Sequence, residues 1–223
     1  LNDVTLNSVS NDGNKPVITA NGQNYTFDAV LYATGRKPNT ANIGLENTDI
    51  TTNERGAIVV NDTCESSVPG VYAVGDVNGG PQFTYISLDD FRIVFGALTG
   101  NGQYTLKDRK NIPYTTFLTP PLARVGLTEE DAINKGYTVK TKEMLVATMP
   151  RAHVNDYLKG AFKIVVNADN DLILGATLYS QGAEELINLI KMAMDNNIPY
   201  TYFKNQIFTH PTMAENLNDL CNF

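Results

Sequence analysis

A histidine and a glutamate near the C-terminus have the types and spacing of an acid–base pair. In the segment His210–Glu215, Pro211 is predicted to occupy the first turn of a helix, which would leave His210 at the cap with its imidazole projecting outward. Glu215 would lie one turn along, and helical side chains lean back toward the N-terminus. Its carboxylate could then hold one imidazole tautomer and raise the basicity of the ring, as general acid–base catalysis requires. A surface histidine at a helix start is the alternative.

Two glycine-containing segments in the first half place charged side chains where ligands bind. Gly70–Asp76 is an apolar run that ends in a glycine and Asp76, and an aspartate at the carboxyl end of a buried strand lies at the ligand edge of an open sheet. Its carboxylate could accept hydrogen bonds from sugar-like hydroxyls, or cap a loop. In Ala33–Asn39, Gly35 permits a positive φ and Arg36 can meet an anion, or the segment is an ordinary strand-ending turn.

Turn residues and periodicity predict the elements of the first half. Asn11–Gly13 and Asn21-Gly22 are hairpin signals. They predict an antiparallel meander of the strands Val4–Val9, Val17–Ala20 and Tyr25–Ala33. A strand, a glycine loop and a helix should follow, with the strand at Val71–Val74 and a helix stop at Gly100. The helix is indicated by apolar residues at helical spacing, namely Tyr85, Leu88, Phe91, Phe95 and Leu98.

From Ile112 onward strands and helices alternate, so we expect a boundary between Lys107 and Ile112. A helix should begin after the hydroxyl cap of Thr128 and close at Gly136. Strands are predicted at Leu122–Val125, Phe162–Val166 and Leu172–Leu178, the last two joined by a hairpin turn at Asp169–Asp171. A second helix carries one apolar stripe, made of Ala183, Leu186, Ile187, Ile190, Ala193 and Met194.

Composition excludes several classes of protein. The chain has 223 residues, of which 42% are hydrophobic and 18% charged, as in ordinary globular proteins of one or two domains. A net charge of −7 argues against a nucleic-acid partner, and no run of residues is apolar enough to cross a membrane. Cys64 and Cys221 are too few for a disulfide scaffold or a zinc site. The start at Leu1 shows neither an initiator Met nor a signal peptide, so we expect a soluble cytoplasmic protein cut from a longer chain.

The order of four segments resembles the class I pyridine nucleotide–disulfide oxidoreductases, the FAD-dependent family of glutathione reductase, dihydrolipoamide dehydrogenase and mercuric reductase. These segments are Ala33–Asn39, Gly70–Asp76, Phe117–Glu129 and His210–Glu215. Gly75–Asp90 is most similar to the reactive-chlorine-resistance branch of that family. The resemblance covers essentially the whole chain.

The resemblance implies a C-terminal half with an α+β and α/β fold. Residues 1–34 would be the last strands of the NAD(P)-binding domain and 35–110 the C-terminal segment of the FAD-binding domain. Residues 111–223 would be an interface domain, with an antiparallel sheet and helices on one side, that forms a homodimer. Such enzymes are much longer, and their N-terminal half carries a Gly-x-Gly-x-x-Gly loop for the FAD pyrophosphate, a redox cysteine pair and a second glycine loop for NAD(P)H. None of these occurs in this sequence.

The resemblance also implies roles for single residues. Asp76, after Gly75, would hold the ribityl chain of FAD, while Gly35 and Arg36 would lie near the FAD-domain crossover. Gln82, Phe83 and Thr84 would run along the flavin ring. His210, with Pro211 and oriented by Glu215, would approach the flavin of the other subunit and shuttle a proton when a thiolate leaves or attacks. In the full-length enzyme hydride would pass from NAD(P)H to FAD and then to the cysteines.

Because those cysteines and glycine loops are missing, we expect the chain alone to bind no FAD and to be inactive. A stand-alone dimerisation module is the alternative reading, and a metal ion or an oxidised chlorine species could replace the disulfide as electron acceptor. An unrelated hydrolase is disfavoured because no Gly-x-Ser-x-Gly elbow is present. His153 is predicted to be a loop residue, Cys221 a packed thiol, and the Met192–Met194 region a core helix with no metal role.

Overall fold

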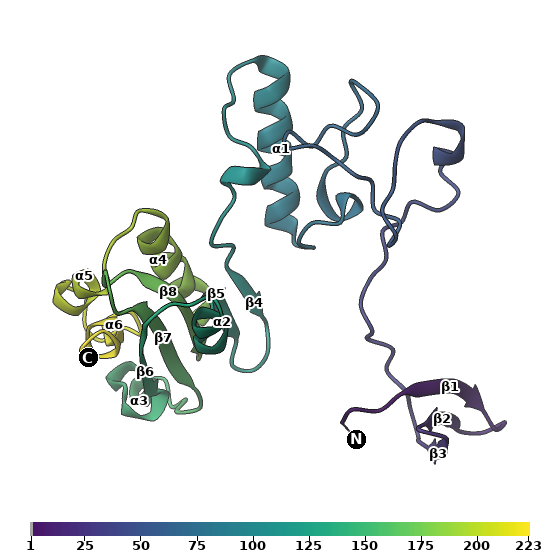
Figure 1. Ribbon diagram of the computed structural model, residues 1–223. Coiled ribbons are helices and arrows are strands. Elements are labelled where there is room, and N and C mark those ends of the chain that lie inside the picture. Colours follow the sequence, from purple (N-terminus) through teal and green to yellow (C-terminus); the bar gives the residue numbers. More distant parts are fainter. Residues whose placement is uncertain (1) are drawn as a thin grey trace. The chain divides into compact units, whose positions relative to one another are not determined.

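The computed structural model describes residues 2–223 and divides the chain into two compact units (Figure 1). Unit 1 is Leu1–Gln103 and unit 2 is Tyr104–Phe223. In the described part of the chain, no helix combines the length and the apolar character that a membrane crossing demands.

Unit 1 begins with the predicted three-stranded antiparallel meander, which is labelled in Figure 1. Its strands are β1 (Leu6–Asn11), β2 (Pro16–Ala20) and β3 (Gln23–Thr26). Asn21 and Gly22 form the tight turn between β2 and β3 with φ values of 50° and 75°, as a two-residue hairpin loop requires. The predicted extension of the third strand to Ala33 is wrong. The N–H of Phe27 still donates to the Pro16 carbonyl of β2 at 3.0 Å, but residues 28–33 belong to no described strand, and an apolar run becomes a strand only where a neighbour accepts its hydrogen bonds.

The same reason corrects the strand predicted at Val71–Val74. Within the described residues this run makes one isolated bridge, between Tyr72 and Glu65, and belongs to no sheet. The glycine loop and the helix that were expected after it are present, as the short 3-10 turn η2 (Gly75–Asn78) and the helix α1 (Thr84–Thr99). A second 3-10 turn, η1 (Leu45–Asn47), precedes them. Gly100 ends α1 in the left-handed conformation with φ 70°.

The apolar stripe that indicated α1 does not face the interior of unit 1. Its members, Tyr85, Leu88, Phe91, Phe95 and Leu98, are all exposed. The helix instead buries Ile86, Asp90 and Ile93, a narrower stripe at heptad-like spacing. Unit 1 therefore carries an apolar helix face that the described chain leaves uncovered.

Unit 2 is built on a five-stranded antiparallel sheet in the order β4-β5-β8-β7-β6. The strands are β4 (Tyr114–Thr116), β5 (Leu122–Gly126), β6 (Val139–Leu145), β7 (Ala161–Asn167) and β8 (Ile173–Tyr179). The predicted strands at β5, β7 and β8 are confirmed, and so is the hairpin between β7 and β8. Its turn uses a positive φ of 61° at Asp171, which aspartate tolerates better than most residues.

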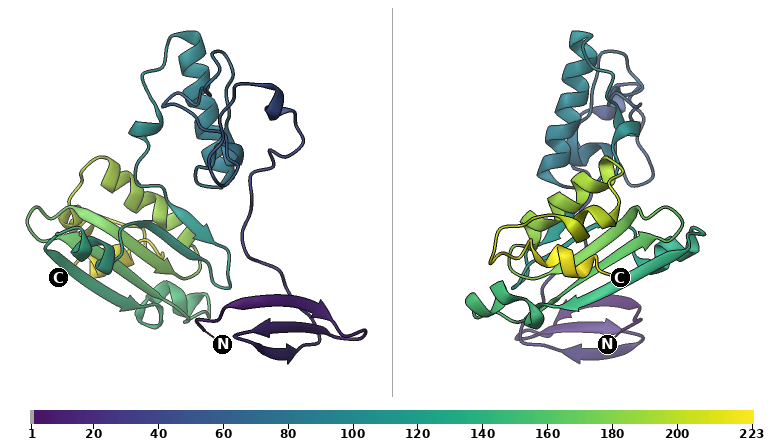
Figure 2. Two further views of the ribbon diagram at one scale, coloured as in Figure 1. Left: turned by 45° about the vertical axis from the view of Figure 1, so that its right-hand side comes forward. Right: turned by 90° about the vertical axis from the view of Figure 1, so that its left-hand side faces the viewer.

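Five helices lie against the sheet of unit 2. They are α2 (Glu129–Asn134), α3 (Pro150–Val154), α4 (Ala183–Asp195), α5 (Tyr200–Asn205) and α6 (Asn216–Leu220), with 3-10 turns η3 (Leu106–Asp108) and η4 (Val146–Thr148). Figure 2 shows the olive and yellow helices α4 to α6 over one face of the green sheet. Thr128 caps α2 as predicted.

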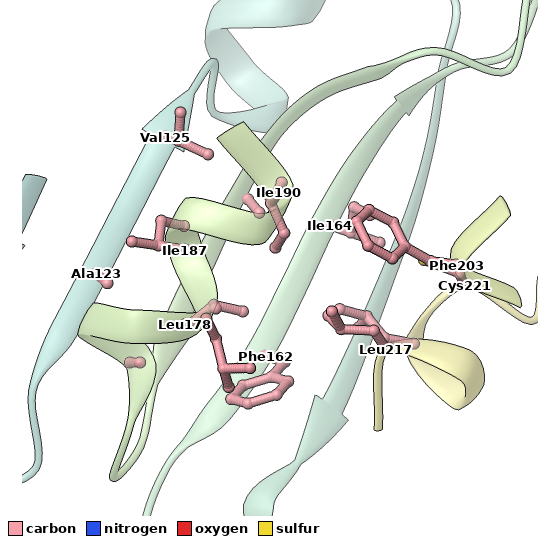
Figure 3. Close-up of a cluster of buried hydrophobic side chains, with 14 of the residues drawn as sticks. Ala123, Val125, Phe162, Ile164, Leu178, Ile187, Ile190, Phe203, Leu217 and Cys221 are labelled. Carbon is pink, nitrogen blue, oxygen red and sulfur yellow. The ribbon is translucent and has the colours of Figure 1, made fainter. Parts of the chain in front are cut away.

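The hydrophobic core of unit 2 lies between that helical layer and the sheet. Figure 3 shows Ile187 and Ile190 of α4 directed at Val125 of β5 and Leu178 of β8. Phe203, Leu217 and Cys221 extend the core beneath α5 and α6. The predicted stripe of α4 is thus confirmed as its buried face. The same core holds α6 in place through Leu217 and Leu220, and with it the loop that precedes α6.

Candidate functional site

The structure brings His210 and Glu215 into direct contact. His210 Nδ1 lies 2.7 Å from Glu215 Oε2. The imidazole side chain is 68% exposed, whereas the carboxylate is only 18% exposed. A largely buried acid therefore contacts one ring nitrogen, and the rest of the ring projects from the surface of unit 2.

The loop around this pair differs from the predicted helix start. Pro211 does not lie in a helix, and the His210–Pro211 peptide is cis. α6 begins at Asn216, so Glu215 is its N-cap residue and precedes the first turn. The predicted proximity of the two side chains is present, but a compact loop that folds Glu215 back beneath His210 produces it.

Both oxygens of the Glu215 carboxylate have a donor. Oε1 accepts a hydrogen bond from the backbone N–H of Thr212 at 3.1 Å, while Oε2 faces His210 Nδ1. A carboxylate accepts and does not donate when ionised, so the bonded form of the neutral ring carries its proton on Nδ1. Nε2 is then the basic nitrogen on the exposed side of the ring, the arrangement that a proton-transferring histidine needs.

A second group of predicted site residues lies in unit 1, around the loop that ends in Asp76. Gly75 has φ 73°, and a Cβ at this position would lie 2.6 Å from Ser87 Oγ. Its backbone N–H donates to the carboxylate of Asp90 at 2.7 Å, and Asn78 Nδ2 donates to the same oxygen at 2.9 Å. The loop is thus fixed from inside by α1, which leaves the side chain of Asp76 44% exposed.

Arg36 and Asp76 approach each other in unit 1. Arg36 Nη1 lies 3.8 Å from Asp76 Oδ2, with the arginine side chain 77% exposed. An exposed ion pair of this length contributes little stability. Gly35, just before it, has φ 100°, a conformation that favours glycine.

Gln82, Phe83 and Thr84, the predicted flavin contacts, lie at the start of α1 and differ in exposure. Gln82 and Thr84 are exposed, and Phe83 stacks on Tyr85 with ring centroids 5.0 Å apart and planes 10° apart. Phe83 is the N-cap of α1 and makes no side-chain capping hydrogen bond. These residues belong to unit 1, whereas His210, Pro211 and Glu215 belong to unit 2.

Sequence reasoning missed Asp90, the fully buried acid that organises the Gly75 loop. A signal was present, because Asp90 lies between Ile86 and Ile93 at positions i, i+4 and i+7 of one helix face. A charged residue at the centre of an apolar stripe indicates a buried hydrogen-bonding role. The larger neighbouring stripe of α1 concealed that pattern.

The remaining candidate residues, His153, Cys221 and the Met192–Met194 region, lie in surroundings that indicate structural roles. His153 lies in α3, not in a loop, because Pro150 starts a short helix there, and its Nε2 is 2.8 Å from the Ala147 carbonyl. Burial raises the pKa of the Cys221 thiol to about 12, so it is a protonated core residue at neutral pH. Met194 packs against the core, but Met192 is exposed. Among the described residues no group of three or more acids, histidines or cysteines could hold a metal ion.

Comparison with protein families places both units in one lineage. Residues 112–221 match the family model described as pyridine nucleotide-disulphide oxidoreductase, dimerisation domain. Residues 2–90 match the model described as pyridine nucleotide-disulphide oxidoreductase.

Individual relatives agree with this result. The chain is 45% identical over 222 residues to the probable pyridine nucleotide-disulfide oxidoreductase RclA of Escherichia coli, covering 98% of this chain and 50% of that protein. It is 36% identical over 218 residues to a mercuric reductase of Staphylococcus aureus, covering 96% of this chain and 40% of that protein.

A solved structure, described as the HOCl-induced flavoprotein disulfide reductase RclA from Escherichia coli, superimposes with a TM-score of 0.92 at 43% identity. It covers 98% of this chain and 50% of that one. The chain thus spans about half the length of the curated relatives it matches.

Proposed function

Because the chain belongs to the pyridine nucleotide-disulfide oxidoreductase family, we propose that it forms the C-terminal half of an FAD-dependent NAD(P)H oxidoreductase that reduces a disulfide. The fold class is that of the family: part of an FAD/NAD(P)-binding fold followed by a dimerisation domain with a five-stranded antiparallel sheet and helices. The activity proposed here belongs to the assembled enzyme.

The observation that carries the proposal is the contact between His210 Nδ1 and Glu215 Oε2 at 2.7 Å, beneath an exposed ring. Disulfide reduction releases a thiolate, and a thiolate needs a proton to leave as a stable thiol. Nε2 of the protonated ring gives that proton and later takes one back, while Glu215 keeps the Nδ1 proton in place and stabilises the imidazolium. A general acid–base of this kind accelerates proton transfer about 10²–10⁴-fold.

Unit 1 contributes contacts to the flavin cofactor in this proposal. The partly exposed carboxylate of Asp76 fits as an acceptor for ribityl hydroxyls, because Gly75 and Asp90 fix the loop while the Asp76 side chain, beside Arg36, stays 44% exposed. Gly35, Arg36 and the segment Gln82–Thr84 would border the same cofactor. FAD supplies hydride acceptance from NAD(P)H and onward electron transfer.

The exposed apolar face of α1 supports a role within a larger fold. A contiguous exposed patch of this kind usually marks an interaction surface. Within the assembled enzyme we assign residues 1–34 to the NAD(P)-binding domain, 35–110 to the FAD-binding domain and 111–223 to the interface domain. A homodimer through 111–223 would present His210, with Pro211 beside it, to the partner's flavin, so each active site would draw on two chains.

Reduction of a metal ion is the second candidate, and the similarity to mercuric reductases favours it. In this chain Cys221 does not support it, because a buried thiol with a pKa near 12 is a poor metal ligand at neutral pH. Disulfide reduction, which uses the His210–Glu215 pair directly, remains the favoured proposal.

A chimera tests the proposal. The N-terminal half of Escherichia coli RclA joined to this chain should be yellow, its flavin band should bleach on addition of NADPH or NADH, and it should reduce a dithiobis(nitrobenzoate) disulfide. The chain alone should be colourless. In the chimera, His210→Ala should lower disulfide turnover about 10²–10⁴-fold without loss of flavin.

His153→Ala is the matched control, because His153 is the other histidine of the sequence and its Nε2 lies against the backbone carbonyl of Ala147. It should leave turnover unchanged. A chimera that folds but holds no flavin would reject the role of unit 1. Equal turnover in the His210→Ala and unmutated chimeras would reject the acid–base role and favour a dimerisation module without catalysis.

A further inference from the structure

We propose that Thr212 is the positioning residue of the His210–Glu215 pair: its hydroxyl and backbone amide set the Glu215 carboxylate so that His210 is held as the Nδ1-protonated tautomer. The inference rests on the proposed function only in that the Nδ1-protonated tautomer is taken to serve proton transfer at Nε2. The positioning itself follows from the hydrogen bonds of the loop Thr209–Glu215.

Thr212 acts on the carboxylate directly. Its backbone N–H donates to Glu215 Oε1 at 3.1 Å, which leaves Oε2 for His210 Nδ1 at 2.7 Å. With one oxygen anchored, the plane of the carboxylate has little freedom to rotate. The same oxygen therefore meets Nδ1 each time the ring adopts this rotamer.

The hydroxyl of Thr212 fixes the two backbone segments that carry the pair. Oγ1 donates to the carbonyl of Thr209, the residue before His210, at 2.8 Å. Oγ1 also accepts from the backbone N–H of Glu215 at 3.2 Å. One side-chain oxygen thus ties the start of the loop to its end, and it sets the separation between the backbones of His210 and Glu215.

Thr212 is itself held from the interior. Asn216 is 1% exposed, and its Nδ2 donates to the carbonyls of Thr212 at 3.2 Å and of Met213 at 3.1 Å. These bonds anchor the loop on α6, whose Leu217 and Leu220 lie in the core of unit 2. The arrangement runs from the core through Asn216 and Thr212 to the carboxylate and then to the exposed ring.

The consequence for the ring is a choice between two neutral tautomers. An imidazole with its proton on Nδ1 presents a lone pair at Nε2, and the other tautomer presents a proton there. Valine has the shape of threonine without the hydroxyl. Thr212→Val therefore removes both bonds of Oγ1 while the backbone N–H remains, and it should loosen the carboxylate from Nδ1.

The test is ¹⁵N NMR of the two imidazole nitrogens in the full chain, at a pH where titration shows the ring to be neutral. The sequence contains two histidines, so His153 serves as an internal reference. We expect mostly Nδ1-protonated His210 in the unmutated chain. Thr212→Val should lower its ratio of Nδ1-protonated to Nε2-protonated ring about two- to tenfold, the range expected when the single hydrogen bond between His210 Nδ1 and Glu215 Oε2 is lost. Thr212→Ser should restore the ratio.

Thr48→Val is the matched control. The hydroxyl of Thr48 also donates to a carbonyl three residues back, of Leu45 at 2.8 Å, and accepts a backbone N–H, of Ile50 at 3.3 Å. It lies in unit 1, outside the loop Thr209–Glu215. This variant should leave the His210 ratio unchanged.

The outcomes separate the two proposals. If Glu215→Gln shifts the tautomer ratio but Thr212→Val does not, the positioning role is overturned and the acid–base pair stands. If the unmutated chain shows no Nδ1 preference, the pair itself fails. Should Thr212→Val not fold, amide exchange in the unmutated chain decides: a slowly exchanging Glu215 N–H is expected from its bond to Oγ1, and exchange at the rate of an open loop would overturn the inference.

Discussion

Asp90 carries a carboxylate into the interior of unit 1, where one oxygen accepts hydrogen bonds from the Gly75 backbone and the Asn78 side chain. A buried acid is tolerated only when donors replace its lost water. Here the donors belong to the loop that contains Asp76. The buried carboxylate of Asp90 is therefore stabilised only when this loop keeps the conformation that exposes Asp76, a candidate cofactor contact. Asp90 thereby links the interior of α1 to the exposed edge of the loop.

At the residue scale we predict that Asp90→Ala destabilises unit 1 by about 1–3 kcal/mol, because it leaves the buried N–H of Gly75 and the partly buried side-chain amide of Asn78 without this acceptor. Urea unfolding followed by circular dichroism measures the loss. Asp49→Ala, at an exposed aspartate of the same unit, should change the free energy of unfolding by less than about 0.5 kcal/mol. Equal effects of the two substitutions would contradict the assigned role.

At the scale of single elements, α2 shows how a short helix is held at its first turn. Thr128 Oγ1 accepts from the backbone N–H of Asp131, and the Asp131 carboxylate accepts from the hydroxyl and the backbone N–H of Thr128. These bonds, with the Thr128 hydroxyl first, hold the pKa of Asp131 below its ordinary value of 3.8. The capping box thus needs the ionised carboxylate.

The stability that this box contributes should depend on pH. Because the pKa of Asp131 is lower in the folded chain than the ordinary 3.8, its contribution is fully present above that value and is lost as pH falls through the folded pKa. Thr128→Ala should therefore lower the stability of unit 2 by about 1 kcal/mol at neutral pH, and by less once the pH has fallen below the folded pKa of Asp131. Thermal unfolding at neutral pH and at such an acidic pH measures both differences.

Thr148→Ala is the control for that experiment. Its hydroxyl donates to the Leu145 carbonyl at 2.7 Å, and no carboxylate takes part in the bond. Its effect on stability should be the same at both pH values. A pH-independent effect of Thr128→Ala would show that Asp131 does not act through the cap.

At the scale of the whole molecule, both units leave large apolar side chains in contact with solvent. In unit 1 these include Leu31, Tyr32 and the outward stripe of α1, and in unit 2 they include Phe117, Met192 and Ile207. Scattered apolar residues are normal, but a continuous helix face is not. The match of residues 112–221 to a dimerisation domain offers one reason for the exposure in unit 2.

We predict that the chain is a homodimer through unit 2. Light scattering coupled to size-exclusion chromatography, at micromolar concentration, should give twice the mass of the chain. The double variant Phe91→Glu, Phe95→Glu, which places charges on the exposed face of α1, should remain a dimer. A monomer in the unmutated chain, or loss of the dimer in this variant, would contradict assembly through unit 2.

The sequence alone predicted the elements whose structure depends on residues close together in the chain. Asn21-Gly22 made a tight turn because both residues adopt a positive φ, Thr128 and Asp131 capped α2 reciprocally, and Gly100 ended α1 in the left-handed conformation. The stripe of α4 identified its buried face because the core it faces lies within the described chain. The ordered motifs were enough to identify the family.

Tertiary structure decided what depends on distant partners. Val71–Val74 and residues 28–33 have strand-like sequences but form no ladder, because a strand exists only when another strand takes its hydrogen bonds. The same dependence concealed the burial of Asp90, which is set by the loop that returns to α1. His210 and Glu215 are spaced for contact in the sequence, yet their 2.7 Å approach comes from a loop held by Thr212 and Asn216, since only the folded core supplies the anchor.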